Sequence, residues 1–227
     1  MSKPSTSLRV WDLPTRVFHI LLLLCVLGLV VTGKVGGNWI EWHARLGTAV
    51  LALLVWRLVW GLVGGRWSRF VHFIYAPRSV VAYLRGRAPL AHRVGHNPLG
   101  ALSVFALLGV LLVQVLTGLS SDDEIAFAGP LVAHLPGSWV SAATRWHKDE
   151  GQLLVLGLIG LHVLAILVYR VVKGERLVGA MLHGDKVVDE PLPPSRDDAM
   201  TRLGALVLLG VCGAAAAAVW RLGASGW

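Results

Sequence analysis

The chain consists of long apolar runs separated by short polar connections, most of which are basic. An apolar run of about 20 residues is long enough to cross the hydrocarbon core of a bilayer. Lipid offers the backbone no hydrogen-bond partner, and the runs lack the apolar–polar alternation of a strand, so each run must be a helix. The pattern predicts an all-α integral membrane protein with five spanning helices, at about residues 17–32, 46–63, 98–119, 153–172 and 203–219.

Composition excludes an ordinary soluble domain, because 55% of the 227 residues are hydrophobic and only 15% are charged. Basic residues precede the first run as in a signal peptide, but no small-residue cleavage site follows it. We therefore expect this helix to be retained. The two cysteines, Cys25 and Cys212, lie in separate apolar runs, which excludes a disulfide framework and a thiolate metal site.

The connections differ in charge. Residues 64–97 hold six arginines and no acidic residue, whereas Asp122, Asp123 and Glu124 follow the third run. Because basic loops remain in the cytoplasm, we expect the N-terminus and residues 64–97 to be cytoplasmic and the C-terminus to lie outside. The same rule and anionic lipid account for the net charge of +8, so nucleic-acid binding is not predicted. Residues 77–84 have the spacing of a short helix lying along the membrane surface.

Four histidines lie at or near the ends of the apolar runs. The predicted topology places His19 and His162 at the inner level of the membrane and His43 and His147 at the outer level. His147 and His162 share one predicted helix and are fifteen residues apart, which is about 22 Å along a helix. One helix therefore has the length to serve two cofactors stacked through the bilayer.

Paired imidazoles favour haem, because a bis-histidine haem needs one histidine on each face of the macrocycle. A histidine at a helix end is more often an ordinary polar residue than a ligand. Taken alone, His43 or His147 would be interpreted as such a polar residue. His162 lies within an apolar run, where an ionisable residue indicates function. Pairing by depth predicts two haems, with His19 and His162 binding the inner haem and His43 and His147 the outer haem.

Helical spacing adds a further candidate, Arg57, which follows His43 by fourteen residues. It is predicted on the same helix face at the inner level, where a guanidinium pairs with a haem propionate; a snorkelling arginine is the alternative. Glycines on the first three helices would let a flat macrocycle approach the backbone, or would serve ordinary helix packing. These glycines are Gly33, Gly47, Gly61, Gly100, Gly109 and Gly118.

The other histidines and the tryptophans receive structural interpretations. His96 is expected in the N-terminal turn of the third helix, and a role in quinone binding or proton relay is its alternative. The histidines in connections are expected to be solvated, namely His72, His92, His134 and His183. Tryptophans near both membrane surfaces are expected to form aromatic belts, namely Trp39, Trp42, Trp139 and Trp146 outside and Trp60 and Trp67 inside.

The fifth run follows a proline-containing connection and carries no ligand candidate. We therefore divide the chain into a haem-binding bundle at 1–185 and a linker with a C-terminal helix at 186–227. The small residues at 213–218 are expected to pack against another membrane helix, outside the haem core.

Several motifs together resemble the bacterial cytochrome b561 family. They are residues 10–19 (VWDLPTRVFH), 95–101 (GHNPLGA), the loop at 117–131 and residues 173–177 (KGERL). The resemblance covers about residues 8–185 and is strongest to the b-type cytochrome subunit of nickel-iron hydrogenases. It implies a four-helix core in the bacterial inner membrane that binds two b haems and transfers electrons between a quinone and a periplasmic partner. The haem ligands that it implies are His19, His43, His147 and His162.

One spacing departs from the family. Its two ligands on the fourth helix are usually fourteen residues apart, and here they are fifteen apart. The extra residue turns the outer histidine away from the common helix face. A π-bulge between Gly151 and Gly160 would absorb it. Without a bulge, the alternatives are an outer haem that is tilted, more exposed or absent.

The resemblance implies an electron-transfer subunit rather than a stand-alone enzyme. Its periplasmic partner would be a c-type cytochrome or an iron-sulfur hydrogenase subunit. The alternatives are a quinone-coupled oxidoreductase acting on a small reductant such as superoxide, and a transporter or metal-handling protein. The sequence leaves association into a homo-oligomer open.

Overall fold

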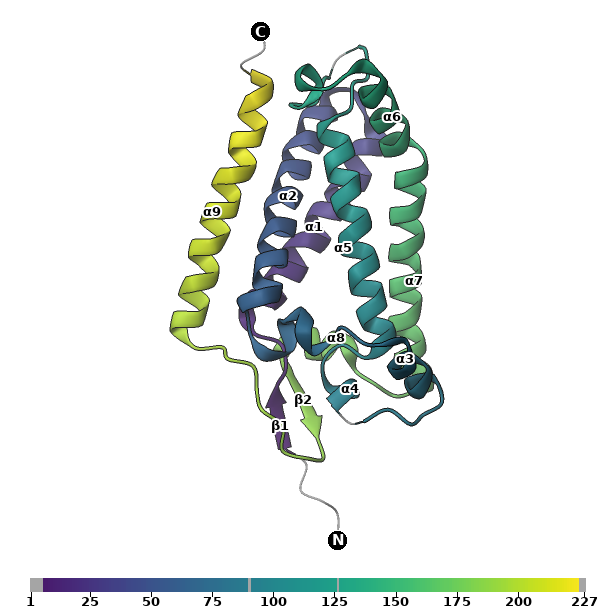
Figure 1. Cartoon of the computed structure of the whole chain (residues 1–227), viewed down its shortest axis with the longest axis vertical. Helices are drawn as coiled ribbons and strands as arrows, with labels where there is room; N and C mark the ends of the chain where they lie inside the picture. Colours follow the sequence, from purple (N-terminus) through teal and green to yellow (C-terminus); the bar gives the residue numbers. More distant parts are fainter. Residues whose placement is uncertain (1–5, 90, 126, 225–227) are drawn as a thin grey trace. The chain divides into compact units, whose positions relative to one another are not determined.

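A computed structural model describes residues 6–89, 91–125 and 127–224. Helices dominate the described chain, and five helical segments are long and apolar enough to span a membrane (Figure 1). This confirms the predicted all-α membrane fold. The long helices are α1 (Leu13–Val35), α2 (Ile40–Val63), α5 (Pro98–Leu119), α6 (Gly137–Lys148), α7 (Glu150–Val172) and α9 (Ala199–Ala224). The shorter elements are β1 (Thr6–Arg9), α3 (Pro77–Leu84), α4 (Ala91–Val94), α8 (Leu177–His183) and β2 (Asp185–Val188).

Side-chain caps fix where two of the spanning helices begin. The Oδ1 atom of Asp12 accepts the backbone N–H of Thr15 at 2.8 Å at the start of α1. The Oδ1 atom of Asn97 accepts the N–H of Gly100 at 2.8 Å, with Pro98 in the first position of α5. Each cap satisfies a donor that the helix leaves free. His96 directly precedes this cap and lies outside the helix, not in its N-terminal turn as predicted.

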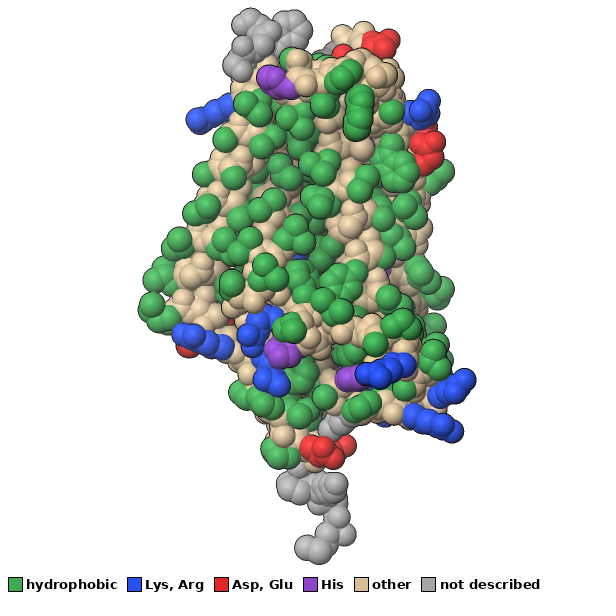
Figure 2. All heavy atoms as spheres, viewed as in Figure 1, with side chains coloured by type: hydrophobic (Ala, Val, Ile, Leu, Met, Phe, Trp, Pro, Cys, Tyr) green, Lys and Arg blue, Asp and Glu red, His purple; other side chains and the backbone are tan. Residues whose placement is uncertain are grey.

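Hydrophobic side chains cover the long helices in Figure 2, and Lys and Arg side chains gather near helix ends. On α1, Leu24, Leu27 and Val31 are each more than half exposed, as lipid-facing residues are. The surface helix predicted at 77–84 is α3, which has the same bounds.

The chain divides into two compact units whose boundaries fall inside the spanning helices. Unit 1 comprises Met1–Phe18, Arg57–Ala106 and Gly160–Leu206, and unit 2 comprises His19–Trp56, Leu107–Ile159 and Val207–Trp227.

In unit 1, β1 and β2 form an antiparallel pair, in which Thr6 lies opposite Val188 and Arg9 opposite Asp185. Neither strand was predicted from the sequence. Strand β2 crosses the domain boundary that we predict after residue 185, so that position is not a boundary of unit 1. The linker beyond it also packs here, since the Ser195 hydroxyl donates to the Val10 carbonyl at 2.6 Å.

Asp197 ties the linker to the N-terminal segment of unit 1. Its carboxylate accepts the Leu13 N–H at 3.1 Å and pairs with Arg9 at 3.2 Å and with Arg202 at 3.0 Å. Burial alone would raise the pKa of Asp197, but the bonds from Arg202 and Leu13 and the two positive charges hold it below its ordinary value.

Trp60 and Trp67 depart from the predicted inner aromatic belt, because both are buried in unit 1. The Trp60 indole donates to Asp12 Oδ1 at 3.3 Å, and the Trp67 indole donates to the Pro193 carbonyl at 3.1 Å. Their N–H groups hold the unit together instead of facing lipid headgroups. Of the tryptophans predicted for the outer belt, Trp39, Trp42 and Trp139 are exposed, as belt residues are, and Trp146 is half-buried.

The core of unit 2 contains residues of α2, α5, α7 and α9, including Val50, Leu111, Val155 and Ala216. The C-terminal helix is predicted outside the haem core, and its second half belongs to the hydrophobic core of unit 2. Ala216 is only 4% exposed, because it packs within this cluster.

Candidate functional site

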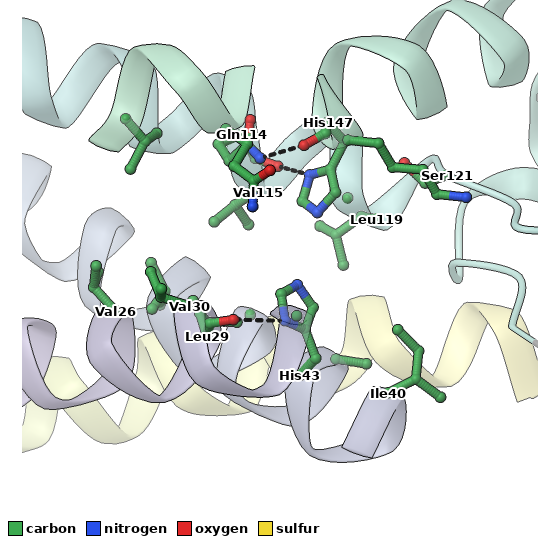
Figure 3. A pocket seen from close by; sticks show the side chains of 18 of the residues that line it. Val26, Leu29, Val30, Ile40, His43, Gln114, Val115, Leu119, Ser121 and His147 are labelled. Carbon is green, nitrogen blue, oxygen red and sulfur yellow. Dashed lines mark hydrogen bonds between the residues drawn. The ribbon is translucent and has the colours of Figure 1, made fainter. Parts of the chain in front are cut away.

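Two of the four predicted histidines face each other across a cavity in unit 2 (Figure 3). His43 comes from the first turns of α2 and His147 from the last turn of α6. Their ring centroids are 6.0 Å apart and the ring planes are nearly perpendicular, at 87°. The cavity has a volume of about 340 Å³.

Both imidazoles bind a main-chain carbonyl through Nδ1. His147 Nδ1 lies 2.8 Å from the Gln114 carbonyl oxygen, and His43 Nδ1 lies 3.1 Å from the Leu29 carbonyl oxygen (Figure 3). A carbonyl only accepts, so each Nδ1 carries the proton and donates it. The lone pair of each neutral ring then resides on Nε2, the nitrogen available to a metal.

Glycines make both contacts possible. In a helix, the residue at i+4 covers the carbonyl of residue i; here Gly33 follows Leu29 and Gly118 follows Gln114 at that interval. A Cβ on Gly33 would lie 3.1 Å from His43 Cε1, and one on Gly118 would lie 2.7 Å from His147 Cε1. These two predicted glycines therefore leave room for the histidine rings. Gly47 also lines the cavity, but a Cβ added to it would contact no atom within 4 Å.

Gln114 holds His147 at a second point. Its side-chain Nε2 donates to the His147 carbonyl at 2.8 Å. That carbonyl lies in the last turn of α6, which is interrupted at Asp149 (φ −110°, ψ −89°) before α7 begins at Glu150. The bond therefore stabilises the end of α6 next to the interruption.

This interruption corrects two predictions about the fourth spanning segment. His147 and His162 lie on one apolar segment, Gly137–Val172, but not on one uninterrupted helix. The predicted π-bulge between Gly151 and Gly160 is wrong, since α7 is a regular α-helix there. The irregularity between the two histidines lies at Asp149.

The walls of the cavity are mainly apolar, and its polar lining residues lie toward the ends of the helices. Lys34 and Lys148 both line it, and Lys34 Nζ donates to Gln152 Oε1 at 3.3 Å. Such a slot suits a flat apolar ligand with anionic groups at one edge. The apolar lining includes Val26, Val30, Val50, Leu111, Val115, Leu119, Val155 and Leu156.

The predicted inner ligands fall in different units. His162 lies on α7 in unit 1, where its Nδ1 is 3.3 Å from the Ser103 hydroxyl. A hydroxyl both donates and accepts, so this contact does not fix the tautomer of His162. His19 lies on α1 in unit 2, and its pairing with His162 stays a prediction.

Arg57 is buried in unit 1 and has an unused donor. Its guanidinium lies 4.7 Å from the centre of the Phe70 ring, and Nη2 donates to the Ser68 carbonyl at 3.1 Å. Nη1 is buried without a hydrogen-bond partner among the described residues. Buried guanidinium N–H groups are normally hydrogen-bonded, and a carboxylate oxygen is a strong acceptor for them.

Asp12 is fully buried in the same unit. One carboxylate oxygen accepts from Thr15 and Trp60, and the other accepts from the Ser68 hydroxyl at 2.6 Å. Ser68 therefore links the carboxylate to Arg57. His96 lies near this cluster, with its ring stacked on Trp11 and Phe73 at centroid distances of 4.6 and 4.3 Å.

Gln114, Ser103 and the role of Asp12 were not predicted from the sequence. Two of them carry a signal there. Asp12 lies in the N-terminal motif directly before a helix, and Gln114 is a polar residue in the apolar run of α5, where the reasoning that singled out His162 would have identified it.

Comparison with known proteins agrees with these features. The family model described as prokaryotic cytochrome b561 matches residues 10–184. The chain is 23% identical over 209 residues to the protein named "Probable Ni/Fe-hydrogenase 1 B-type cytochrome subunit" of Escherichia coli strain K12, covering 77% of this chain and 88% of that protein. The protein of that name in Escherichia coli O157:H7 matches to the same extent. No solved structure matches the chain. The protein is a multi-pass b-type membrane cytochrome of electron transfer, and it belongs to the prokaryotic cytochrome b561 family.

Proposed function

We propose that the protein binds two b haems and transfers electrons between the quinone pool and a redox partner at the outer membrane surface. The His43–His147 pair carries the proposal. A metal–imidazole bond is about 2 Å long, so two rings on opposite faces of one iron have centroids about 6 Å apart. The observed separation of 6.0 Å fits this arrangement.

The residues around His43 and His147 would orient the haem ligands, exclude water and neutralise the propionates. A haem bound there supplies the one-electron couple of its iron. The Gln114 and Leu29 carbonyls orient the imidazoles and raise their basicity, which favours the oxidised state of a bound metal. The apolar walls exclude water, and Lys34 and Lys148 lie where they can neutralise propionates.

For the inner haem we propose His19 and His162 as ligands and Arg57 as a propionate partner. The unpaired Nη1 of Arg57 supports this role, because a propionate would complete its hydrogen bonds. The quinone would then react at the inner side.

The charge of the connections supports the orientation. The arginine-rich residues 64–97 would face the cytoplasm of a bacterial inner membrane, and the C-terminus would face the periplasm. A hydrogenase subunit is the first candidate for the periplasmic partner, because the relatives are named as hydrogenase cytochrome subunits. A c-type cytochrome is the second candidate.

A haem count tests the proposal directly. Purified full-length protein is expected to contain two haems per chain by pyridine haemochrome assay, with the narrow α-bands of low-spin b haem in the reduced spectrum. A well-folded preparation without these bands, or one with a single haem in every preparation, would overturn the dihaem assignment.

Gln114→Leu is expected to weaken the outer site alone. The change removes the bond to the His147 carbonyl, which is worth about 1 kcal/mol, or about fivefold in haem retention. One haem should dissociate faster and its midpoint potential should shift, as followed by dilution into apomyoglobin and by redox titration. Gln152→Leu is the matched control, since Gln152 also lines the cavity but bonds Lys34. Equal haem loss from the two variants would contradict the role of Gln114.

A further inference from the structure

The C-terminal helix α9 lies beyond the family match, which ends at residue 184. Its second half nevertheless packs into unit 2. The packed residues are spaced along one helix face, and Cys212 and Ala216 are each only 4% exposed. Val219 and Trp220 extend this face, with Val219 against the core cluster and Trp220 in the lining of the histidine cavity.

The outer end of α9 meets the loop that follows α5. The Trp220 ring stacks on Phe127 with centroids 6.4 Å apart and planes at 28°. A Cβ on Gly223 would lie 2.8 Å from Pro130 Cα, so the helix and the loop are in close contact. Phe127 and Pro130 also line the cavity.

Backbone bonds hold that loop in place. Gly129 N–H donates to the Ser121 carbonyl at 2.8 Å, and Leu131 N–H donates to the Leu119 carbonyl at 3.0 Å. The Asp123 carboxylate accepts the Phe127 N–H at 2.8 Å. The aromatic pair therefore rests on a fixed loop on one side and on a helix on the other.

We propose that α9 is a wall of the outer haem pocket and that Trp220, stacked on Phe127, closes it against small solutes. This inference rests on the proposed function. A covered site excludes water and small reductants, so electrons would pass through a protein docked at this surface. The wall thus favours electron transfer with a protein partner over direct reaction with a diffusible molecule.

An engineered cross-link tests the position of α9 without any haem. In the full chain carrying Cys25→Ala and Cys212→Ala, the pair Pro130→Cys and Gly223→Cys should form an intramolecular disulfide on mild oxidation. The ideal Gly223 Cβ lies 3.1 Å from Pro130 Cβ, and disulfides join Cβ atoms about 3.5–4.5 Å apart. Pro130→Cys with Val211→Cys is the control, because Val211 is about 18 Å along the helix from Gly223. Equal cross-linking of both pairs, or none in either, would overturn the proposed wall.

Trp220→Ala tests the closure itself. In the reduced protein, a ferrous haem gives one electron to ferricyanide, which becomes ferrocyanide. This oxidation should be severalfold faster for one haem in the variant, and the midpoint potential of that haem should fall as water reaches it. Trp139→Ala is the matched control, since Trp139 is also on the outer side and is exposed.

The outcomes separate the two proposals. Unchanged oxidation rate and potential in Trp220→Ala would overturn the closure by Trp220. Absence of haem from the unmodified protein would overturn the proposed function, while the cross-link would still report whether α9 lies against the loop.

Discussion

His162→Ala is expected to leave one haem per chain, and His147→Ala is expected to leave the other one. Each change removes one of the two axial ligands that we propose for one haem, and low-spin bis-histidine binding is lost at that site alone. The double variant should bind none. Haem content per chain, measured by pyridine haemochrome assay on protein of unchanged size-exclusion profile, checks all three.

The two single variants should also differ in midpoint potential. The outer imidazoles donate to main-chain carbonyls, which favours the ferric state and lowers the potential. The inner site has Arg57 nearby in our assignment, and a buried positive charge favours the ferrous state. The haem left in His147→Ala should therefore titrate at a higher potential than the haem left in His162→Ala. Electrons would then run downhill from the outer side toward the inner side.

His134→Ala serves as the control, because His134 is exposed and belongs to no proposed pair. It should retain both haems. Two haems in His162→Ala would show that His162 is not an axial ligand, and the pairing by depth would fail with it.

The spanning helices were predictable because length and apolarity alone determine them in lipid. Their ends were not. Helix α2 begins at Ile40, six residues before the predicted 46, because the apolar pattern does not detect a first turn that contains the polar residues Glu41 and Arg45. The β1–β2 pair escaped prediction since each strand has four residues and little alternation.

The proximity of His43 and His147 was predictable from depth, but the orientation of their rings was not. Depth places His43 and His147 at one level. The carbonyls that fix their tautomers belong to α1 and α5 and become accessible only through Gly33 and Gly118. A sequence shows that these glycines exist, but the partner of an exposed carbonyl depends on the packing of a different helix.

The interruption at Asp149 was also beyond sequence reasoning. The fifteen-residue interval between His147 and His162 predicted some irregularity, and the glycines at 151 and 160 suggested a bulge between them. The structure instead ends α6 after Lys148, where the Gln114 amide binds the His147 carbonyl. The Gln114 side chain that makes this contact is 33 residues from His147 in the sequence, so the local sequence does not show it.

Asp12→Asn is expected to destabilise the haem-free protein by about 1–3 kcal/mol. The amide keeps the size of the carboxylate, and its oxygen still accepts the N–H bonds from Thr15 and Trp60, but its NH2 group cannot accept the hydrogen bond of the Ser68 hydroxyl. Its charge is lost, however, and the Arg57 guanidinium, on which that charge acts, is only 3% exposed. A buried cation without its counter-charge is costly, so the free energy of unfolding, measured by denaturant titration in detergent, should fall.

A double-mutant cycle with Arg57→Met separates charge from shape. If the two charges stabilise each other, Asp12→Asn should cost much less in the Arg57→Met background than in the unmodified protein. Repeating the measurement on haem-loaded protein also tests whether Arg57 binds a propionate. A propionate bound at Arg57 Nη1 would replace part of the lost negative charge, so the cost of Asp12→Asn should be smaller in haem-loaded than in haem-free protein. An equal cost in both forms would mean that Arg57 holds no propionate, even if His162 proves to be a ligand.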